Sequence, residues 1–231
     1  MHAITIIALL ISAAVSVAAQ GPATATTVTL DPGRLRLQGI SASSATHDGR
    51  AAVRLVEAGG RKDGGLAIVE TRPFLDGEIA IDVAARRGAF AVPDDRGFAG
   101  IAFRLTADAA RYENVYLRPD NGRADDQVRR NHSVQYVSHP DFPWPLLRKN
   151  FPEKYESYVD LQPGVWTRMR VVVRGATARL FVHGNEQPTL VVNDLKLAPA
   201  PGGVALWIGP GTEAFFANLR ITTDRPASPR H

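Results

Sequence analysis

The chain of 231 residues contains no cysteine and carries 27 basic and 23 acidic side chains, which gives a formal net charge of +4. The missing cysteine excludes disulfides, thiolate metal sites and a lipid anchor on cysteine, so burial alone must hold the fold. Most basic residues are arginine, and such a surface can serve nucleic acid, an anionic membrane or an acidic polymer.

Residues 1–19 have the features of a secretory signal peptide. Residues 3–19 form an uncharged run of apolar and small residues that ends in Val17-Ala18-Ala19. We expect cleavage after Ala19, and an uncleaved membrane span is the alternative because about 17 residues is the minimum for crossing a bilayer. Cleavage predicts a periplasmic or secreted protein with no membrane contact and no nucleic-acid partner.

Strand-like segments follow one another along the rest of the chain. Most are short, many alternate apolar and polar residues, and Gly, Pro, Asn or Asp bounds them. The predicted strands occupy residues 28–30, 34–40, 51–56, 66–70, 78–83, 99–105, 113–118, 133–138, 166–173, 177–182, 190–193, 204–208 and 215–221. No segment after residue 19 has the apolar spacing of a helix. The pattern predicts an all-β fold, an antiparallel two-sheet β-sandwich (jelly roll), rather than a small barrel.

One domain accounts for these strands, since sandwiches commonly reach about 200 to 250 residues. We expect a linker at residues 20–29, the sandwich at 30–222 with a long insertion at 119–158, and a disordered tail at 223–231.

The clearest hairpin lies at residues 166–182, where a short turn containing Gly175 joins two alternating runs. Because side chains alternate across a strand, the apolar residues should share one face of the sheet. They are Met169, Val171, Val173, Ala178, Leu180 and Val182. The opposite face would hold Phe181 and four arginines: Arg168, Arg170, Arg174 and Arg179. It is either a solvated exterior or a cationic floor for an anionic glycan.

The segment 119–158 breaks the regular spacing and is rich in aromatic and charged residues. Irregular connections longer than about 12 to 15 residues are uncommon and often functional. The alternative is an Ω-type cover over one sheet. Within the segment, prolines on both sides of Trp144 restrict the backbone, so the ring either forms a rigid platform for a sugar or plugs a gap in the sandwich.

A polar stretch at residues 129–139 supplies further candidates. As a strand, it would place His132 and Tyr136 on one face, and Asn131, Gln135 and His139 on the other. A histidine exchanges protons near neutral pH, and an arginine or amide lowers the cost of ionising a carbon next to a uronate carboxylate. A structural, hydrogen-bonded imidazole is the alternative for either histidine.

Three segments carry a resemblance: the hairpin at 166–182, the run Gly203-Val-Ala-Leu-Trp-Ile-Gly209 and the terminal Phe215-Phe-Ala-Asn-Leu-Arg-Ile221. Together they resemble the concanavalin A-like lectin/glucanase superfamily, in particular its laminin G-like and 3-keto-disaccharide hydrolase-like domains. The resemblance implies the sandwich fold and a carbohydrate ligand. Its members include lectins, hydrolases, lyases and adhesion modules, so the chemistry must be argued from the site.

The residues leave several activities open. The E-x-D-x-(x)-E motif of laminarinase-type members is absent, whereas hydrolysis needs two carboxyl groups about 5 to 9.5 Å apart. Hydrolysis is our first enzymatic hypothesis and β-elimination of a uronate polymer the second. The alternatives are a non-catalytic carbohydrate-binding or adhesion module and a structural envelope protein. No cofactor is expected; the metal alternative is a calcium ion held by Asp120, Asn121, Asp125 and Asp126.

We therefore predict an exported protein that binds and hydrolyses an oligo- or polysaccharide through the 119–158 region. The predicted catalytic residues are His132, Asp126, Tyr136 and Glu113. The predicted substrate-binding residues are Arg123, Arg129, Asn131, Gln135, His139 and Trp144.

Overall fold

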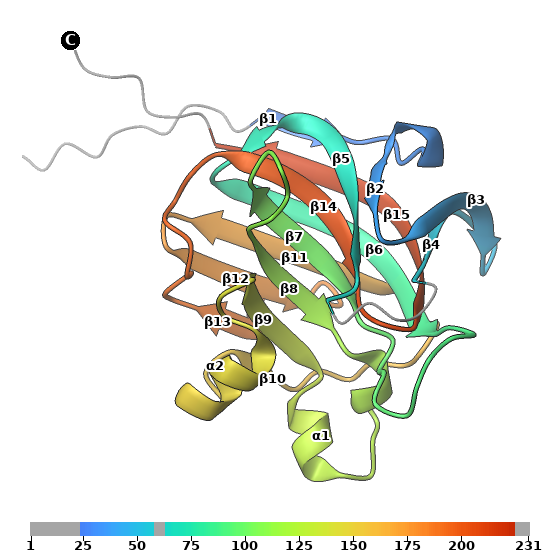
Figure 1. Ribbon diagram of the computed structural model, residues 1–231, viewed down its shortest axis with the longest axis vertical. Coiled ribbons are helices and arrows are strands. Elements are labelled where there is room, and N and C mark those ends of the chain that lie inside the picture. The colour runs from blue at the N-terminus through green and yellow to red at the C-terminus, as the bar shows by residue number, and fades with distance from the viewer. Residues whose placement is uncertain (1–23, 58–62, 225–231) are drawn as a thin grey trace, which may run out of the picture.

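Two antiparallel β-sheets stack face to face in the computed structural model, which describes residues 24–57 and 63–224 (Figure 1). The eight-stranded sheet has the order β13-β12-β11-β6-β15-β4-β3, with β1 paired to β15. Its strands are β1 (Thr24–Thr27), β3 (Ser41–His47), β4 (Arg50–Val56), β6 (Gly77–Arg87), β11 (Thr167–Arg174), β12 (Thr177–Val182), β13 (Leu190–Val192) and β15 (Thr212–Thr223).

The seven-stranded sheet lies in front in Figure 1 and has the order β10-β9-β8-β7-β14-β5-β2. Its strands are β2 (Arg36–Gln38), β5 (Gly65–Phe74), β7 (Ala99–Leu105), β8 (Tyr112–Leu117), β9 (Val134–His139), β10 (Glu156–Ser157) and β14 (Gly202–Ile208). The predicted antiparallel two-sheet sandwich is therefore confirmed.

The main core fills the space between the two sheets. Alternation along the strands turns one set of side chains inward, and the largest of these are at most 1% exposed, including Leu55, Ile81, Phe103, Leu180 and Phe216. Burial of each large apolar side chain contributes about 1.5 to 3 kcal/mol. Burial of these side chains is the main contribution to the stability of a fold that has no disulfides.

The predicted hairpin is present as β11 and β12. Its six inward residues pair across the strands as Met169 with Val182, Val171 with Leu180, and Val173 with Ala178. All six are at most 1% exposed. The predicted alternation is thus confirmed, and the arginines of both strands lie on the outer face of the eight-stranded sheet.

The N-terminal region differs from expectation. The segment 20–29 is not a linker throughout, because β1 pairs with the end of β15. Strand β3 is a further addition; its sequence, Ser-Ala-Ser-Ser-Ala-Thr-His, has no large apolar residue and so gives no strand signal. The predicted signal peptide (1–19) and residues 225–231 of the predicted tail lie outside the described residues.

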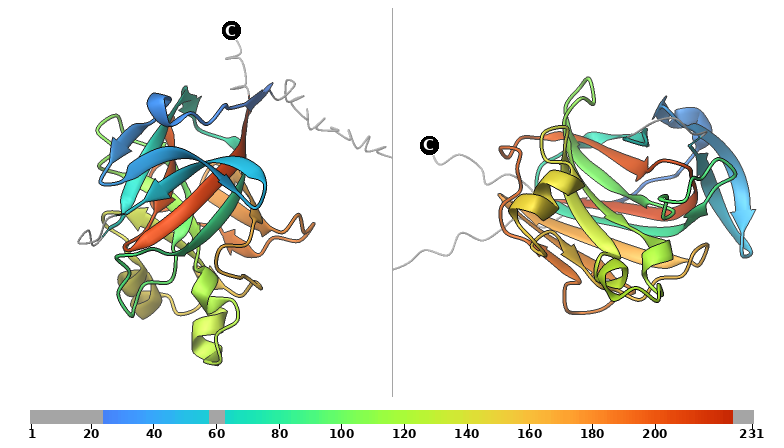
Figure 2. Two further views of the ribbon diagram at one scale, coloured as in Figure 1. Left: turned by 90° about the vertical axis from the view of Figure 1, so that its right-hand side faces the viewer. Right: turned by 60° about the horizontal axis from the view of Figure 1, so that its bottom comes forward.

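The segment 119–158 extends one sheet instead of covering it. It contains a 3-10 helix (Pro119–Asn121), α1 (Gln127–Asn131), β9, α2 (Trp144–Asn150) and β10. β9 pairs with β8 and β10 with β9, so the segment forms one edge of the seven-stranded sheet. Both α-helices lie at the same end of the sandwich (Figure 2).

These two helices escaped prediction because they are five and seven residues long, too short for an apolar period. The carboxylate of Asp126 starts α1 by accepting a hydrogen bond from the Arg129 backbone N–H at 2.9 Å. Pro143 and Pro145 fix the start of α2, where their missing N–H groups cost nothing. Another short 3-10 helix occupies Pro32–Arg34. None of the helices in the described ranges is long and apolar enough to cross a membrane.

Candidate functional site

The ends of β8, β9 and β10 meet α1 and α2 at one edge of the seven-stranded sheet (Figures 1 and 2). Alternation turns Glu113 and Tyr136 into the sandwich and turns Tyr116 and Gln135 to the outer face. Arg118 follows β8 directly, and the only carboxylate of β10 is that of Glu156. The topology therefore gathers side chains that are up to 38 residues apart in sequence.

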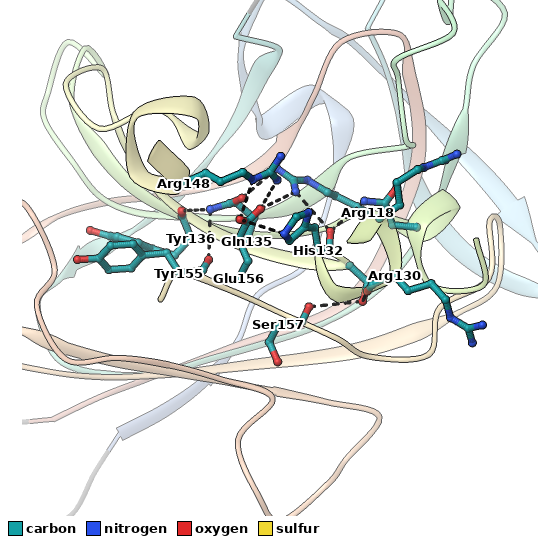
Figure 3. Close-up of polar contacts among 12 residues, drawn as sticks. Arg118, Arg130, His132, Gln135, Tyr136, Arg148, Tyr155, Glu156 and Ser157 are labelled. Carbon is teal, nitrogen blue, oxygen red and sulfur yellow. Dashed lines mark hydrogen bonds and ion pairs between the residues drawn. The ribbon is translucent and has the colours of Figure 1, made fainter. Parts of the chain in front are cut away.

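A buried ion cluster forms at this edge, where Arg118 and Arg148 converge on Glu156 (Figure 3). Arg118 donates to Glu156 Oε1 at 3.0 Å, and Arg148 donates through Nε to Oε2 at 2.9 Å and through a second N–H to Oε1. The Glu156 and Arg118 side chains are only 3% and 5% exposed. The charge-assisted fork of Arg148 fixes the angle of its guanidinium group, and Arg118 adds a single charge-assisted bond.

Arg118 also ties the cluster to the sheet. Its guanidinium donates to the Tyr116 hydroxyl at 3.1 Å and to Gln135 Oε1 at 3.0 Å. The Gln135 amide in turn donates to the carbonyl oxygen of Tyr136 at 2.8 Å. Nε of Arg118 is buried and has no hydrogen-bond partner among the described residues.

The cluster sets the charge states at this edge. Burial raises the pKa of Glu156, but the hydrogen bonds from Arg148 and the charge of Arg118 outweigh it, so the pKa lies below the usual value and the carboxylate is ionised. His132 Nε2 lies 3.6 Å from Glu156 Oε2, too far for a good hydrogen bond. Burial and the nearby arginines lower the pKa of His132 against the opposing effect of Glu156, so its ring is neutral at pH 7.

Trp144 stands over the cluster at the start of α2. The guanidinium carbon of Arg148 is 4.6 Å from the centroid of the indole ring and that of Arg118 is 5.6 Å away, both within cation–π range. The residue is nonetheless 44% exposed. Trp144 does not plug a gap in the sandwich; it is an aromatic surface that the arginines beside it hold in place.

A layer of aromatic rings continues from the cluster across the outer side of the sheet, and its members Tyr112, Tyr116 and Trp207 are buried. Tyr116 packs against Trp207 with ring centroids 4.7 Å apart, and Tyr112 stacks on His139 at the same distance. Asn114 lies between the two tyrosines on β8; it is fully buried, and neither its Nδ2 nor its Oδ1 has a partner among the described residues. A buried amide left without partners costs about 1 to 3 kcal/mol.

The four predicted catalytic residues do not form one site. Tyr136 and Glu113 do meet, but inside the sandwich: the Tyr136 hydroxyl donates to Glu113 Oε2 at 2.8 Å and both residues are fully buried. His132 ends α1 and is not part of β9, so it does not share a strand face with Tyr136. Asp126 is exposed and serves as a helix cap.

The six predicted binding residues are likewise spread over several places, and three of them lie at or beside the ion cluster. Trp144 and Gln135 belong to the ion cluster, and His139 stacks on the buried Tyr112 of the adjoining aromatic layer. Arg123 instead makes a two-point ion pair with Asp160, at 2.7 Å for each contact. Arg129 and Asn131 are exposed on α1, where the Asn131 side chain accepts a hydrogen bond from Gln127.

The structure adds Arg118, Arg148 and Glu156 to the site. No spacing pattern in the sequence points to these residues, because the pairing of β8, β9 and β10 and the position of α2 together bring them into contact. For the calcium alternative, no group of three or more His, Cys, Asp or Glu side chains in residues 24–57 and 63–224 is placed to hold a metal ion.

Comparison with known proteins gives the fold. No protein-family model and no curated protein matches the sequence. A structure named as carbohydrate binding module CBM66 from Bacillus subtilis is 12% identical with a TM-score of 0.50, over 80% of this chain and 96% of that chain. A Bacillus subtilis protein of unknown function with a galectin-like fold is 11% identical with a TM-score of 0.51, over 89% and 99%. The predicted concanavalin A-like sandwich is thereby confirmed as the fold.

Replacing Glu156 tests the ion cluster. Glu156→Gln keeps the side-chain shape but leaves two guanidinium groups without their carboxylate, so we expect the free energy of unfolding at pH 7 to fall by about 3 kcal/mol. Because the folded pKa of Glu156 is depressed, its stabilisation is complete above the unfolded pKa of about 4.3 and is lost as the pH falls through the folded value. The difference from the wild type should therefore shrink below about pH 4.

Urea denaturation across this pH range measures both effects. The matched control is Asp160→Asn, which removes a carboxylate from an ion pair whose side chains are both half exposed. It should change stability by less than about 1 kcal/mol. Equal losses in the two variants would contradict the assigned role of Glu156.

Glu113 should show the opposite pH dependence. Burial raises its pKa, although hydrogen bonds from Leu197 N–H and Tyr136 oppose the shift. A carboxyl group with a raised folded pKa contributes stability that is present below the unfolded pKa of about 4.3 and is lost as the pH rises through the folded value. Glu113→Gln cannot ionise, so the variant should gain stability relative to the wild type as the pH rises above the unfolded pKa of about 4.3. A difference in unfolding free energy that stays constant with pH would show that Glu113 ionises freely.

Proposed function

We propose that the protein binds a saccharide at the edge of the seven-stranded sheet, with Trp144 as the platform. The observation that carries the proposal is the exposed indole ring held above two fixed guanidinium groups. A rigid aromatic face binds the C–H face of a sugar ring with little loss of side-chain entropy. The preformed position of Trp144 is what such a site requires.

Polar groups beside the ring supply directional contacts. The Arg148 side chain is 35% exposed, so it can donate to a ligand while it holds Glu156. The neutral His132 ring can donate or accept. With the exposed Trp144 ring, these groups form a mixed apolar and hydrogen-bonding surface of the kind that fits a carbohydrate.

The comparisons support binding in general terms. One protein of the same fold is named as a carbohydrate-binding module, and at 12% identity this likeness concerns the fold and not the residues of the site. The argument for this chain therefore depends on Trp144 and the cluster beneath it.

We place binding before hydrolysis. Both hydrolytic mechanisms need a protonated carboxyl group beside the glycosidic oxygen. Arg118 and Arg148 keep Glu156 ionised, and Glu113, whose pKa is raised, lies in the core with Tyr136. His132 is the group at this edge that is suited to proton exchange near pH 7, which keeps hydrolysis and β-elimination as testable second proposals.

Trp144→Ala is expected to weaken binding of the preferred sugar by at least about tenfold with an unchanged unfolding curve, because the residue is exposed and packs outside the core. Phe90→Ala, at another exposed aromatic residue, is the control and should bind like the wild type. The assay is a panel of neutral and uronic-acid oligosaccharides followed by thermal shift and calorimetry.

The same incubations measure catalysis. New reducing ends would establish hydrolysis, and ultraviolet absorbance of unsaturated products would establish elimination. Stabilisation without products would identify a binding module. No response to any sugar, or equal binding by Trp144→Ala and the wild type, would refute the proposed site.

We further propose that the protein is exported. The support is the uncharged apolar run at residues 3–19 and its small residues before Gln20. Expression of the full chain in a bacterial host should yield a periplasmic or secreted form that begins at Gln20, which mass spectrometry of the intact protein detects. A product that keeps residues 1–19 in the membrane fraction would favour the uncleaved span.

A further inference from the structure

The outer face of the eight-stranded sheet, on the other side of the sandwich from Trp207, is rich in arginine. We call it the arginine face and define it by residues of β4, β6, β11, β12 and β15: Arg50, Arg54, Arg86, Arg168, Arg170, Arg174, Arg179 and Arg220. The sequence left this surface open between a solvated exterior and a cationic floor. The contacts of these arginines decide between the two.

Two carboxylates of this face, those of Asp82 and Glu213, lie beneath the guanidinium groups. Asp82 binds both Arg50 and Arg168, at 2.8 and 3.0 Å. The Asp82 side chain is 13% exposed, whereas the two arginine side chains are 42% and 37% exposed. A ligand that approaches this part of the sheet therefore meets guanidinium N–H groups before the carboxylate oxygens, whereas Glu78 is 38% exposed against 33% for its partner Arg170.

The same arrangement recurs across the sheet. Glu213 binds both Arg54 and Arg86, at 2.6 and 2.7 Å, and is 12% exposed against 42% and 48% for the arginines. In both groups of three side chains, one carboxylate is shared by two arginines, so each group of three carries a net positive charge. A solvated face of balanced ion pairs would not leave this excess.

Other arginines add unpaired charge. Arg179 and Arg220 have no ion-pair or hydrogen-bond partner for their side chains among residues 24–57 and 63–224. Arg170 and Arg220 lie on either side of Ala80 in one cross-strand row, about 9.6 Å apart at two strand spacings. The eight arginines contact four carboxylates, those of Glu78, Asp82, Glu213 and Asp224.

We propose that the arginine face binds an anionic polysaccharide whose carboxylates accept hydrogen bonds from these guanidinium groups. Arginine presents a planar fork of donors that matches a carboxylate, and every basic side chain that defines the face is arginine. The face is distinct from the Trp144 site, so the two surfaces can be tested separately.

The character of the aromatic residues on this face favours a polysaccharide over a lipid membrane. Phe181 and Phe215 are 9% and 5% exposed, and the guanidinium group of Arg170 stacks 3.8 Å above the Phe181 ring. A membrane surface site presents exposed apolar side chains that enter the lipid. Here the aromatic rings lie beneath arginine, and the exposed apolar side chain next to Arg179 is the small Val191, which is 39% exposed.

The test is binding of polygalacturonate to the full chain, measured by calorimetry over a series of salt concentrations. We expect binding that weakens steeply with added salt, because each ion pair releases bound counterions. Reversing the two unpartnered charges in the variant Arg179→Glu with Arg220→Glu should weaken binding by at least about tenfold without loss of packing. The control is Arg36→Glu with Arg72→Glu, which makes the same charge change on exposed strands of the other sheet.

Four outcomes decide the proposal. Loss of binding in the face variant alone supports it, and retained binding in Trp144→Ala shows that the second surface is independent of the first. Equal losses in the face and control variants would reduce the effect to net charge and overturn it. Binding to anionic phosphatidylserine vesicles but not to polygalacturonate would replace the polysaccharide with a membrane, and no binding to either would leave a solvated face.

Discussion

The carboxylate of Glu156 lies between two arginines from different parts of the chain, and the arrangement of this edge of the protein depends on that contact. Arg118 comes from the end of β8 and Arg148 from α2, so one side chain fastens a helix to a sheet. Glu156 and Arg118 are buried, so the carboxylate and the arginines are both needed. A guanidinium group without its carboxylate would be an uncompensated charge in a poorly hydrated place. The position of Trp144 follows from this attachment.

The two sheets use arginine in different ways. At the edge of the seven-stranded sheet, one arginine is buried and the other half-buried, both bind one carboxylate, and they support the exposed ring of Trp144. On the arginine face the arginines are numerous, exposed and only partly neutralised. A single sandwich therefore presents one surface suited to stacking and another suited to anions, with a shared apolar core between them.

Strand alternation predicted the parts of the fold that are local. The β11–β12 hairpin has a strict period of two and a glycine turn, so its inward residues could be assigned from sequence. β3 was not predicted, because its serine and alanine residues give no apolar–polar alternation. The prolines beside Trp144 indicated a restricted backbone, but whether its ring is exposed or fills the sandwich could be decided only from the structure.

The candidate site was less predictable because its chemistry is non-local. His132 looked like a strand residue, but the carboxylate of Asp126 starts a short helix that ends at His132. Glu113 and Tyr136 were chosen for their chemistry, and their strand faces turn them into the core. Glu156 became visible only when β10 was paired with β9, because a two-residue strand carries no pattern of its own.

Helix α2 contributes Trp144 and Arg148 but takes no part in the strand pairing of either sheet. Its exposed residues can therefore change without shifting the register of any strand, provided that Leu147 still fills its place in the core and one arginine still reaches Glu156. Ligand preference and folding are thus encoded in largely separate parts of the chain. A lineage built on this sandwich can diversify what it recognises through a few substitutions in one helix while its core is inherited unchanged.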